Sequence, residues 1–183
     1  MPAPTPGAAS AMSAPGPRPE PPLWRRLVYG RSLKRTLLRA ALLMSVAFVV
    51  FRFILIPVRI EGDSMAPTYR DGGVNFINQL AYARHPPRRG DVVGVMMAGR
   101  RVMLFKRIVA LPNERFSIAR GRVFIDGQPL DEPYVRERSP WEITPRTLGP
   151  DEYLLIGDNR GMDQRLHVFG AAKADRIVGK VLW

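Results

Sequence analysis

Ser64 and Lys106 are the two residues of this chain whose surroundings best suit nucleophilic chemistry. Ser64 lies within residues 60–68, directly after the longest apolar run of the sequence. A serine hydroxyl is a weak nucleophile at neutral pH, so it needs a base that can take its proton. Lys106 is flanked by apolar residues, and burial among them would disfavour its ammonium form and lower its pKa. The pattern therefore predicts a serine nucleophile that is activated by a neutral lysine.

Each of these residues also has a plainer interpretation. A serine after Gly-Asp is usually a turn or helix-capping residue, and an isolated lysine on a strand is usually exposed. His167 is an alternative base, because histidine is the usual partner of a nucleophilic serine. His85 lies in an Arg- and Pro-rich segment typical of an exposed loop. The sequence has no spacing of metal ligands, so neither a metal nor another cofactor is expected.

The charge and cysteine content exclude several classes of function. The chain has 183 residues, a formal net charge of +12 and no cysteine. Seven Lys or Arg and one Glu lie in residues 1–39, so this segment carries half of the net charge. The other basic residues are spread among acidic ones without a nucleic-acid-binding motif, which disfavours nucleic acid as a partner. The absence of cysteine excludes disulfides, thiol catalysis and cysteine-based zinc sites.

Residues 1–57 divide into a tail and an apolar segment. Residues 1–35 are rich in Pro and Ala and then basic, with eight prolines among the first 22 residues, which predicts a disordered tail. Residues 36–57 are apolar enough for a transmembrane helix if Arg39 and Arg52 extend their charges to the two interfaces. The alternative for this segment is a buried core helix.

The expected anchor also predicts the topology of the chain. No cleavage site with small residues follows the apolar segment, so the segment is expected to stay in the mature protein. The basic residues before it predict a cytoplasmic N-terminus, which leaves residues 58–183 on the outer side of the membrane.

Residues 58–183 are predicted to form a mainly β domain of antiparallel strands. Short apolar segments alternate with turns rich in Gly, Asp and Arg, and no segment after residue 60 has a sustained helical period. The expected strands are residues 74–79, 91–97, 101–110, 115–119, 122–126, 152–157 and 176–182. Long loops are expected at residues 80–90 and 137–150.

Four segments resemble, in order, the sequence boxes of bacterial type I signal peptidases, a family of membrane-anchored Ser-Lys proteases. Residues 62–68 (Gly-Asp-Ser-Met-Ala-Pro-Thr) are similar to the nucleophile box, G-x-S-M-x-P-T. Residues 89–93 (Arg-Gly-Asp-Val-Val) resemble the R-G-D-V-V strand. Residues 106–112 (Lys-Arg-Ile-Val-Ala-Leu-Pro) resemble the general-base box, K-R-x-x-G-x-P. Residues 157–160 (Gly-Asp-Asn-Arg) match the start of the last box.

The rest of the last box departs from the family's form, G-D-N-R-x-x-S-x-D-S-R-x-aromatic-G. An ungapped match places Asp163 at the serine that supports the lysine, Arg165 at the aspartate and His167 at the arginine. A shift of two residues would instead preserve Asp163 and Arg165 as the family's Asp-Arg pair. On the ungapped match, a nearby Asp163 carboxylate would raise the pKa of Lys106, so we expect Arg160 or Arg165 to pair with Asp163.

The resemblance implies a fold, an activity and a location. The fold is an antiparallel β-sheet catalytic domain of signal-peptidase type behind one N-terminal transmembrane helix. The activity is that of a serine endopeptidase that removes signal peptides from exported preproteins. The implied location is the bacterial cytoplasmic membrane, and the implied partners are secretory preproteins, membrane lipid and the export translocon.

The resemblance also assigns roles to individual residues. Ser64 is the implied nucleophile and Lys106 the implied general base. The residues implied to support the oxyanion or the lysine are Gly62, Ser64, Asp158 and Asp163. The residues implied to line shallow pockets for small substrate side chains are Ile60, Met65 and Phe105.

Two other classes of function remain open. The altered last box is compatible with a catalytically impaired, membrane-anchored β module of the same fold that only binds peptides. A self-cleaving repressor uses related Ser-Lys chemistry, but it would carry a DNA-binding head in place of an anchor.

Overall fold

The first described element of the chain is a long apolar helix. The structure, a computed structural model, describes residues 33–97 and 102–182, so the predicted tail lies almost entirely outside the described residues. Helix α2 (Leu33–Val49) continues as a π-helical segment, η1 (Val50–Ile54). Together they form a helix of 22 residues, Leu33–Ile54, that is long and apolar enough to cross a membrane and is not buried within the protein. The chain's two compact units divide within α2, between Ser45 and Val46, and every strand belongs to the second unit.

The apolar run forms both the helix and the first strand. The sequence predicts a helix that extends to residue 57, but Leu55–Arg59 forms strand β1. β1 pairs with β2 (Val74–Asn78), with Leu55 opposite Asn78 and Arg59 opposite Val74. The amino-acid composition does not mark the boundary between the helix and β1, because Ile, Leu and Val suit both a membrane helix and a paired strand. The tertiary pairing with β2 therefore ends the helix earlier than the sequence predicts.

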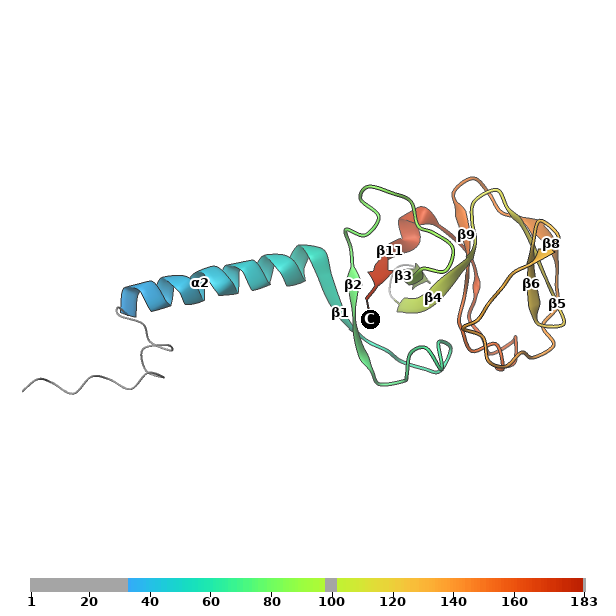
Figure 1. Cartoon of the computed structure of the whole chain (residues 1–183), viewed down its shortest axis with the longest axis horizontal. Helices are drawn as coiled ribbons and strands as arrows, with labels where there is room; N and C mark the ends of the chain where they lie inside the picture. The colour runs from blue at the N-terminus through green and yellow to red at the C-terminus, as the bar shows by residue number, and fades with distance from the viewer. Residues whose placement is uncertain (1–32, 98–101, 183) are drawn as a thin grey trace, which may run out of the picture. The chain divides into compact units, whose positions relative to one another are not determined.

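The strands form two antiparallel sheets (Figure 1). The larger sheet has the order β1-β2-β11-β3-β4-β9-β10, and the smaller has the order β7-β6-β5-β8. The remaining bounds are β3 (Val92–Met97), β4 (Val102–Ala110), β5 (Arg115–Ala119), β6 (Arg122–Ile125), β7 (Gln128–Pro129), β8 (Ile143–Thr147), β9 (Glu152–Ile156), β10 (Gly170–Lys173), the short 3-10 helix η2 (Ala174–Arg176) and β11 (Ile177–Val181). This architecture confirms the mainly antiparallel β fold behind one N-terminal apolar helix.

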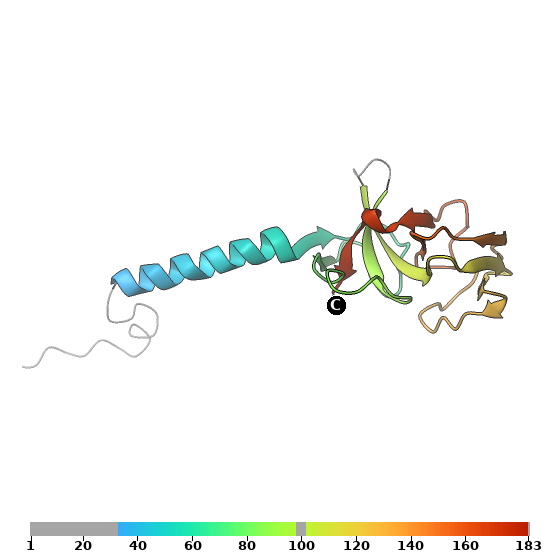
Figure 2. The same ribbon diagram turned by 90° about the horizontal axis from the view of Figure 1, so that it is seen from above.

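Strand β4 links the two sheets. It pairs with β3 on one side and β9 on the other, and its residues 105–110 are all buried. The chain then turns into β5 of the smaller sheet, which lies at the end of the β unit away from β1 and β2 (Figure 1, Figure 2). The apolar cluster at this junction consists of Val109, Ala110, Phe116, Ile118, Val123, Trp141, Leu148, Leu154 and Ile156. The second half of β4 is therefore held rigidly between the sheets.

Three further strands depart from the prediction. β8 lies within residues 137–150, where a loop is expected, because its segment Ile-Thr-Pro-Arg-Thr has one large apolar residue and a proline. β10 reads Gly-Ala-Ala-Lys, and β7 has only two residues. These segments become strands because neighbouring strands supply their hydrogen-bond partners: β8 pairs with β5, β10 with β9 and β7 with β6.

Candidate active site

Ser64 lies in a tight turn that follows β1. The N–H of Ala66 donates to the carbonyl of Asp63 (3.0 Å), and the N–H of Tyr69 donates to the carbonyl of Met65 (3.0 Å). Met65 and Tyr69 are buried in an apolar cluster that also contains residues of β2, β3, β4 and β11. The turn is therefore anchored in the sheet, while the Ser64 side chain stays partly exposed.

Lys106 brings its amine directly to the Ser64 hydroxyl. It lies on β4, opposite Val93 of β3, and is 3% exposed. Its Nζ atom is 2.7 Å from Ser64 Oγ, a hydrogen-bonding distance. Burial lowers the pKa of Lys106 from 10.5 to about 8, against the weaker opposing attraction of the Asp158 carboxylate. A substantial fraction of Lys106 is therefore neutral near pH 8, and a neutral amine can accept the serine proton.

Arg107, the next residue of β4, binds the carboxylate of Asp158. Its Nε donates to Oδ1 (2.8 Å) and its Nη2 to Oδ2 (2.6 Å), so the pair is bidentate, and both residues are buried. Thr68, from the turn that carries Ser64, donates its hydroxyl to Oδ2 of Asp158 (2.5 Å). Asp158 therefore links the turn that carries Ser64 to β4, beside Lys106.

The segment after β9 contacts the backbone of Ser64. β4 and β9 are antiparallel, so the residues after β9 lie alongside the part of β4 that precedes Arg107. The N–H of Asn159 donates to the Ser64 carbonyl (3.1 Å), and its side-chain amide donates to the Asp63 carbonyl (3.0 Å). Gly157 packs so closely that a Cβ atom there would lie 2.1 Å from the Ser64 carbonyl oxygen. Only glycine fits at this position without moving the Ser64 backbone.

Two buried side chains hold the backbone of Gly157. The Gly157 N–H donates to Nε2 of His167 (2.9 Å), and Nε of Arg160 donates to the Gly157 carbonyl (2.8 Å). Because Nε2 of His167 accepts an N–H bond, the imidazole is neutral and carries its proton on Nδ1. Burial, followed by the positive charges of Lys106 and Arg160, lowers the pKa of His167 to about 3. The ring therefore acts as an uncharged acceptor at neutral pH.

The three residues expected to bind substrate line one cavity together with Ser64. Ile60, Met65 and Phe105 are buried and surround about 210 Å³ with several neighbours from β1 and β4. This volume is below that of sites for drug-sized ligands. The cavity suits a small apolar side chain placed next to the Ser64 hydroxyl.

Gly62 shapes the turn before Ser64. Its φ of 88° is a left-handed conformation that glycine adopts without strain. Its N–H donates to the carboxylate of Asp71 (2.8 Å). Gly62 therefore contributes backbone conformation at this position, and its N–H is already engaged.

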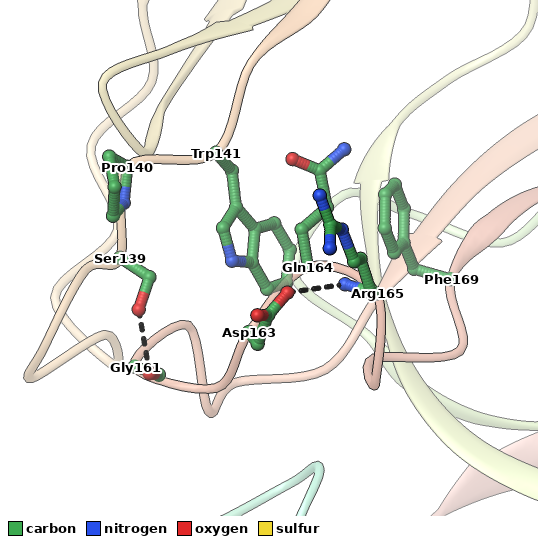
Figure 3. Close-up of a pocket in the computed structure, with 8 residues that line it drawn as sticks. All are labelled: Ser139, Pro140, Trp141, Gly161, Asp163, Gln164, Arg165 and Phe169. Atoms are coloured by element: carbon green, nitrogen blue, oxygen red, sulfur yellow. Dashed lines mark hydrogen bonds between the residues drawn. The ribbon is translucent and has the colours of Figure 1, made fainter.

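The structure corrects the expected support of Lys106 by Asp163. Asp163 is exposed, and its Oδ1 accepts the backbone N–H of Arg165 (2.9 Å), as Figure 3 shows. Residues 160–166 fold as successive turns, which carry this carboxylate to the surface. The carboxylate that acts on Lys106 is that of Asp158. The pocket around Asp163 is lined by Ser139, Pro140, Trp141, Gly161, Gln164, Arg165 and Phe169.

Of the two arginines expected to pair with Asp163, Arg165 contributes its backbone N–H, and Arg160 pairs with another carboxylate. Arg160 Nη2 lies 2.5 Å from Oε1 of Glu132, and both side chains are 1% exposed. The buried acidic side chains of the site are thus committed to arginines, Glu132 to Arg160 and Asp158 to Arg107. Within residues 33–97 and 102–182, no group of three or more His, Asp or Glu side chains is arranged to hold a metal ion.

Sequence reasoning did not identify Arg107, Thr68 and Glu132 as parts of the site. Arg107 and Thr68 belong to the segments that carry Lys106 and Ser64, and this proximity in sequence could have identified them. Glu132 lies in a short Asp-Glu-Pro segment that no pattern distinguishes from an exposed loop. Its partner is 28 residues away, so only the folded chain reveals the buried pair.

Comparisons with known proteins relate the chain to signal peptidases. The family model described as "Signal peptidase, peptidase S26" matches residues 33–183. A signal peptidase I of Leptolyngbya laminosa is 29% identical over 131 residues, which cover 67% of this chain and 64% of that protein. A probable signal peptidase I-1 of Synechocystis sp. is 30% identical over 155 residues, 80% of this chain and 78% of that protein. A crystal structure of a signal peptidase I from Enterococcus faecalis V583 matches with a TM-score of 0.42 and 21% identity, covering 52% of this chain and 97% of that one.

Proposed function

The chain belongs to the signal peptidase family, peptidase S26, and is a peptidase, and from this we propose that it removes signal peptides from exported preproteins with Ser64 as nucleophile and Lys106 as general base. The observation that carries the proposal is the 2.7 Å contact between the buried Lys106 Nζ and Ser64 Oγ. It supplies what a serine nucleophile needs, a base with a neutral fraction within hydrogen-bond reach.

The proposed reaction has two halves. The Lys106 amine takes the proton of the Ser64 hydroxyl as Oγ attacks the carbonyl carbon of the scissile peptide bond. The resulting ammonium gives this proton to the leaving amine, the C–N bond breaks, and the signal peptide stays as an ester on Ser64. The amine of Lys106 then activates a water that hydrolyses this ester and regenerates the serine.

The geometry favours Lys106 over His167 as the base. Nε2 of His167 accepts the Gly157 N–H, so this lone pair is occupied and does not face the serine hydroxyl. The hydrogen bond at Ser64 Oγ comes from Lys106. A lysine buried among apolar residues also has the low proton affinity that the role requires.

The oxyanion of the tetrahedral intermediate is proposed to bind the backbone N–H of Ser64. The N–H of Gly62 donates to Asp71, which supports this choice. Asn159 and Gly157 hold the Ser64 peptide in place, so the donor is positioned before the substrate binds.

Specificity is proposed to come from the small cavity beside the nucleophile, which is lined in part by apolar side chains. Ile60, Met65 and Phe105 limit it to about 210 Å³, which favours small side chains in the substrate before the cut. Rejection of larger side chains would follow from the buried aromatic ring of Phe105, because it packs edge-to-face against Tyr69 at 6.1 Å and cannot easily yield.

We further propose that the segment 36–57 includes the membrane anchor, with residues 1–35 in the cytoplasm and the catalytic β domain, residues 58–183, outside. The apolar helix Leu33–Ile54 and the basic residues before it support this arrangement. Enzyme and preprotein would then meet in one membrane, with lipid and the export translocon as neighbours. Protease added outside spheroplasts should digest residues after 58 and spare the tail; protection of those residues would reverse the orientation.

The experiment that tests the function is cleavage of a purified preprotein by the full-length protein in detergent micelles. The wild type should release the mature protein, and Ser64→Ala should not. Ser117→Ala serves as the matched control, because Ser117 is also partly buried but lies on β5 in the other sheet. A wild-type protein that binds the preprotein without cleaving it would instead identify a peptide-binding module.

A further inference from the structure

His167 is held in a fixed orientation by aromatic rings. It is 4% exposed, and its ring lies edge-to-face on Trp141, with 4.9 Å between centroids and 64° between planes. Phe169 is 6.1 Å from His167 and stacks on Trp141 at 5.2 Å. Figure 3 shows these two aromatic residues on the wall of the neighbouring pocket. Because rings packed in this way have few alternative rotamers, the position of Nε2 is fixed.

Gly157 connects Nε2 of His167 to the backbone of Ser64. It accepts the Gly157 N–H at 2.9 Å. A Cβ on Gly157 would lie 2.7 Å from Nε2 and Cε1 of His167, and 2.1 Å from the Ser64 carbonyl oxygen. Gly157 is therefore in close contact with the imidazole and with the nucleophile backbone. A displacement of Gly157 must be passed to Ser64, since the contacts leave no free space.

The charges around His167 favour the neutral ring. The charged groups that face it are Lys106, from β4, and Arg160, from the turn after β9, and both are positive; the Asn159 backbone favours the charged ring, but its effect is the smallest of these. An imidazolium would direct an Nε2–H against the Gly157 N–H and would add positive charge beside these two. The aromatic neighbours on its other side, Trp141 and Phe169, offer no counter-charge.

We propose that His167 is a positioning residue of the Ser64–Lys106 pair: its neutral ring accepts the Gly157 N–H and so holds the turn that fixes the Ser64 backbone. This inference rests on the proposed function of that pair. His167 acts through Gly157 and exchanges no proton with the substrate. Its loss should therefore lower kcat, because the nucleophile is misplaced, and should leave KM unchanged, because the apolar cavity is untouched.

The test compares two variants of the full-length protein. His167→Gln keeps an acceptor that does not titrate, and His167→Met keeps the volume without an acceptor. We expect kcat of the Gln variant within about threefold of the wild type, and kcat of the Met variant lower by about tenfold or more at unchanged KM. The acidic limb of the pH–rate profile should stay in place in both, because a neutral ring adds no charge at Lys106.

Three results would overturn the proposal. Equal kcat in all three proteins would show that the hydrogen bond does not matter. Equal losses in both variants would show that the imidazole packing, and not the acceptor, is required. Disappearance of the acidic limb in His167→Gln would make His167 the base.

A measurement on the wild type keeps the proposal testable if His167→Met does not fold. The chain has two histidines, so ¹⁵N NMR of the imidazoles can be assigned with a single His85→Gln variant. We expect His167 as the neutral Nδ1–H tautomer from pH 5 to 9; an Nε2–H tautomer or a protonated ring in that range would refute it. The proposed function has its own test: it would be refuted if the wild type did not cleave the preprotein, or if Ser64→Ala did cleave it.

Discussion

Gly157→Ala tests how closely the segment after β9 controls the nucleophile. The new Cβ would lie 2.1 Å from the Ser64 carbonyl oxygen and 2.7 Å from the His167 ring. Carbon atoms do not approach an oxygen closer than about 3 Å, so the nucleophile backbone or the segment after β9 must move by roughly 1 Å. A misplacement of about 1 Å at a reacting centre can cost about 10²-fold in rate. We expect this loss in kcat, with a stability cost of about 1–3 kcal/mol from overpacking.

The assay for this prediction is preprotein cleavage by the full-length variant, with thermal unfolding in micelles to confirm that it folds. Gly149→Ala is the matched control, since a Cβ there meets only the Glu152 side chain, at 3.4 Å. The control should retain wild-type kcat. A folded Gly157→Ala protein with kcat within about threefold of the wild type would refute the close packing on which the reasoning rests.

Three further predictions address the lysine, the buried ion pair and the cavity. Since only neutral Lys106 can act as base, kcat/KM should rise with pH, and the midpoint of this rise should lie near the Lys106 pKa of about 8. A midpoint near 10.5 in the pH–rate profile would contradict the effect of burial. Glu132→Gln leaves the Arg160 charge buried without its partner and should lower the free energy of unfolding by about 3–5 kcal/mol. Both values are measured by urea titration, in which Arg146→Ala, which removes an exposed ion pair, should cost less than about 1 kcal/mol. Phe105→Ala enlarges the substrate cavity, so the ratio of kcat/KM for preproteins with Leu and with Ala before the cut should rise by at least about tenfold; an unchanged ratio would remove Phe105 from the specificity site.

The fold was predictable where strands alternate with clear turn residues. Strands β2 to β6, β9 and β11 fall within one or two residues of the predicted ranges, apart from residue 101, which lies outside the described residues. β1 was not predictable, because its apolar residues continue those of the helix, and only pairing with β2 separates them. β8 and β10 lack strand-forming composition and depend on β5 and β9.

The candidate site was predictable in its sequence-local parts. The segments that resemble the signal-peptidase boxes pointed to Ser64 and Lys106, and the structure brings their side chains to 2.7 Å. The support of these residues was not predictable, because it depends on contacts between distant segments, such as Thr68 with Asp158 and Gly157 with His167. Asp163 illustrates the limit. Its position in the box suggests a contact with the lysine, yet the local turns carry its carboxylate to the surface.

The role of Lys106 as the general base is tested by the cleavage rate of Lys106→Met at pH 9. Methionine retains most of the length and the apolar contacts of lysine but cannot accept a proton from Ser64. With an unfolding temperature close to that of the wild type, the variant should lose at least about 10³-fold in kcat/KM. A folded Lys106→Met protein that cleaves the preprotein within about tenfold of the wild-type rate would contradict the assignment of Lys106 as the base.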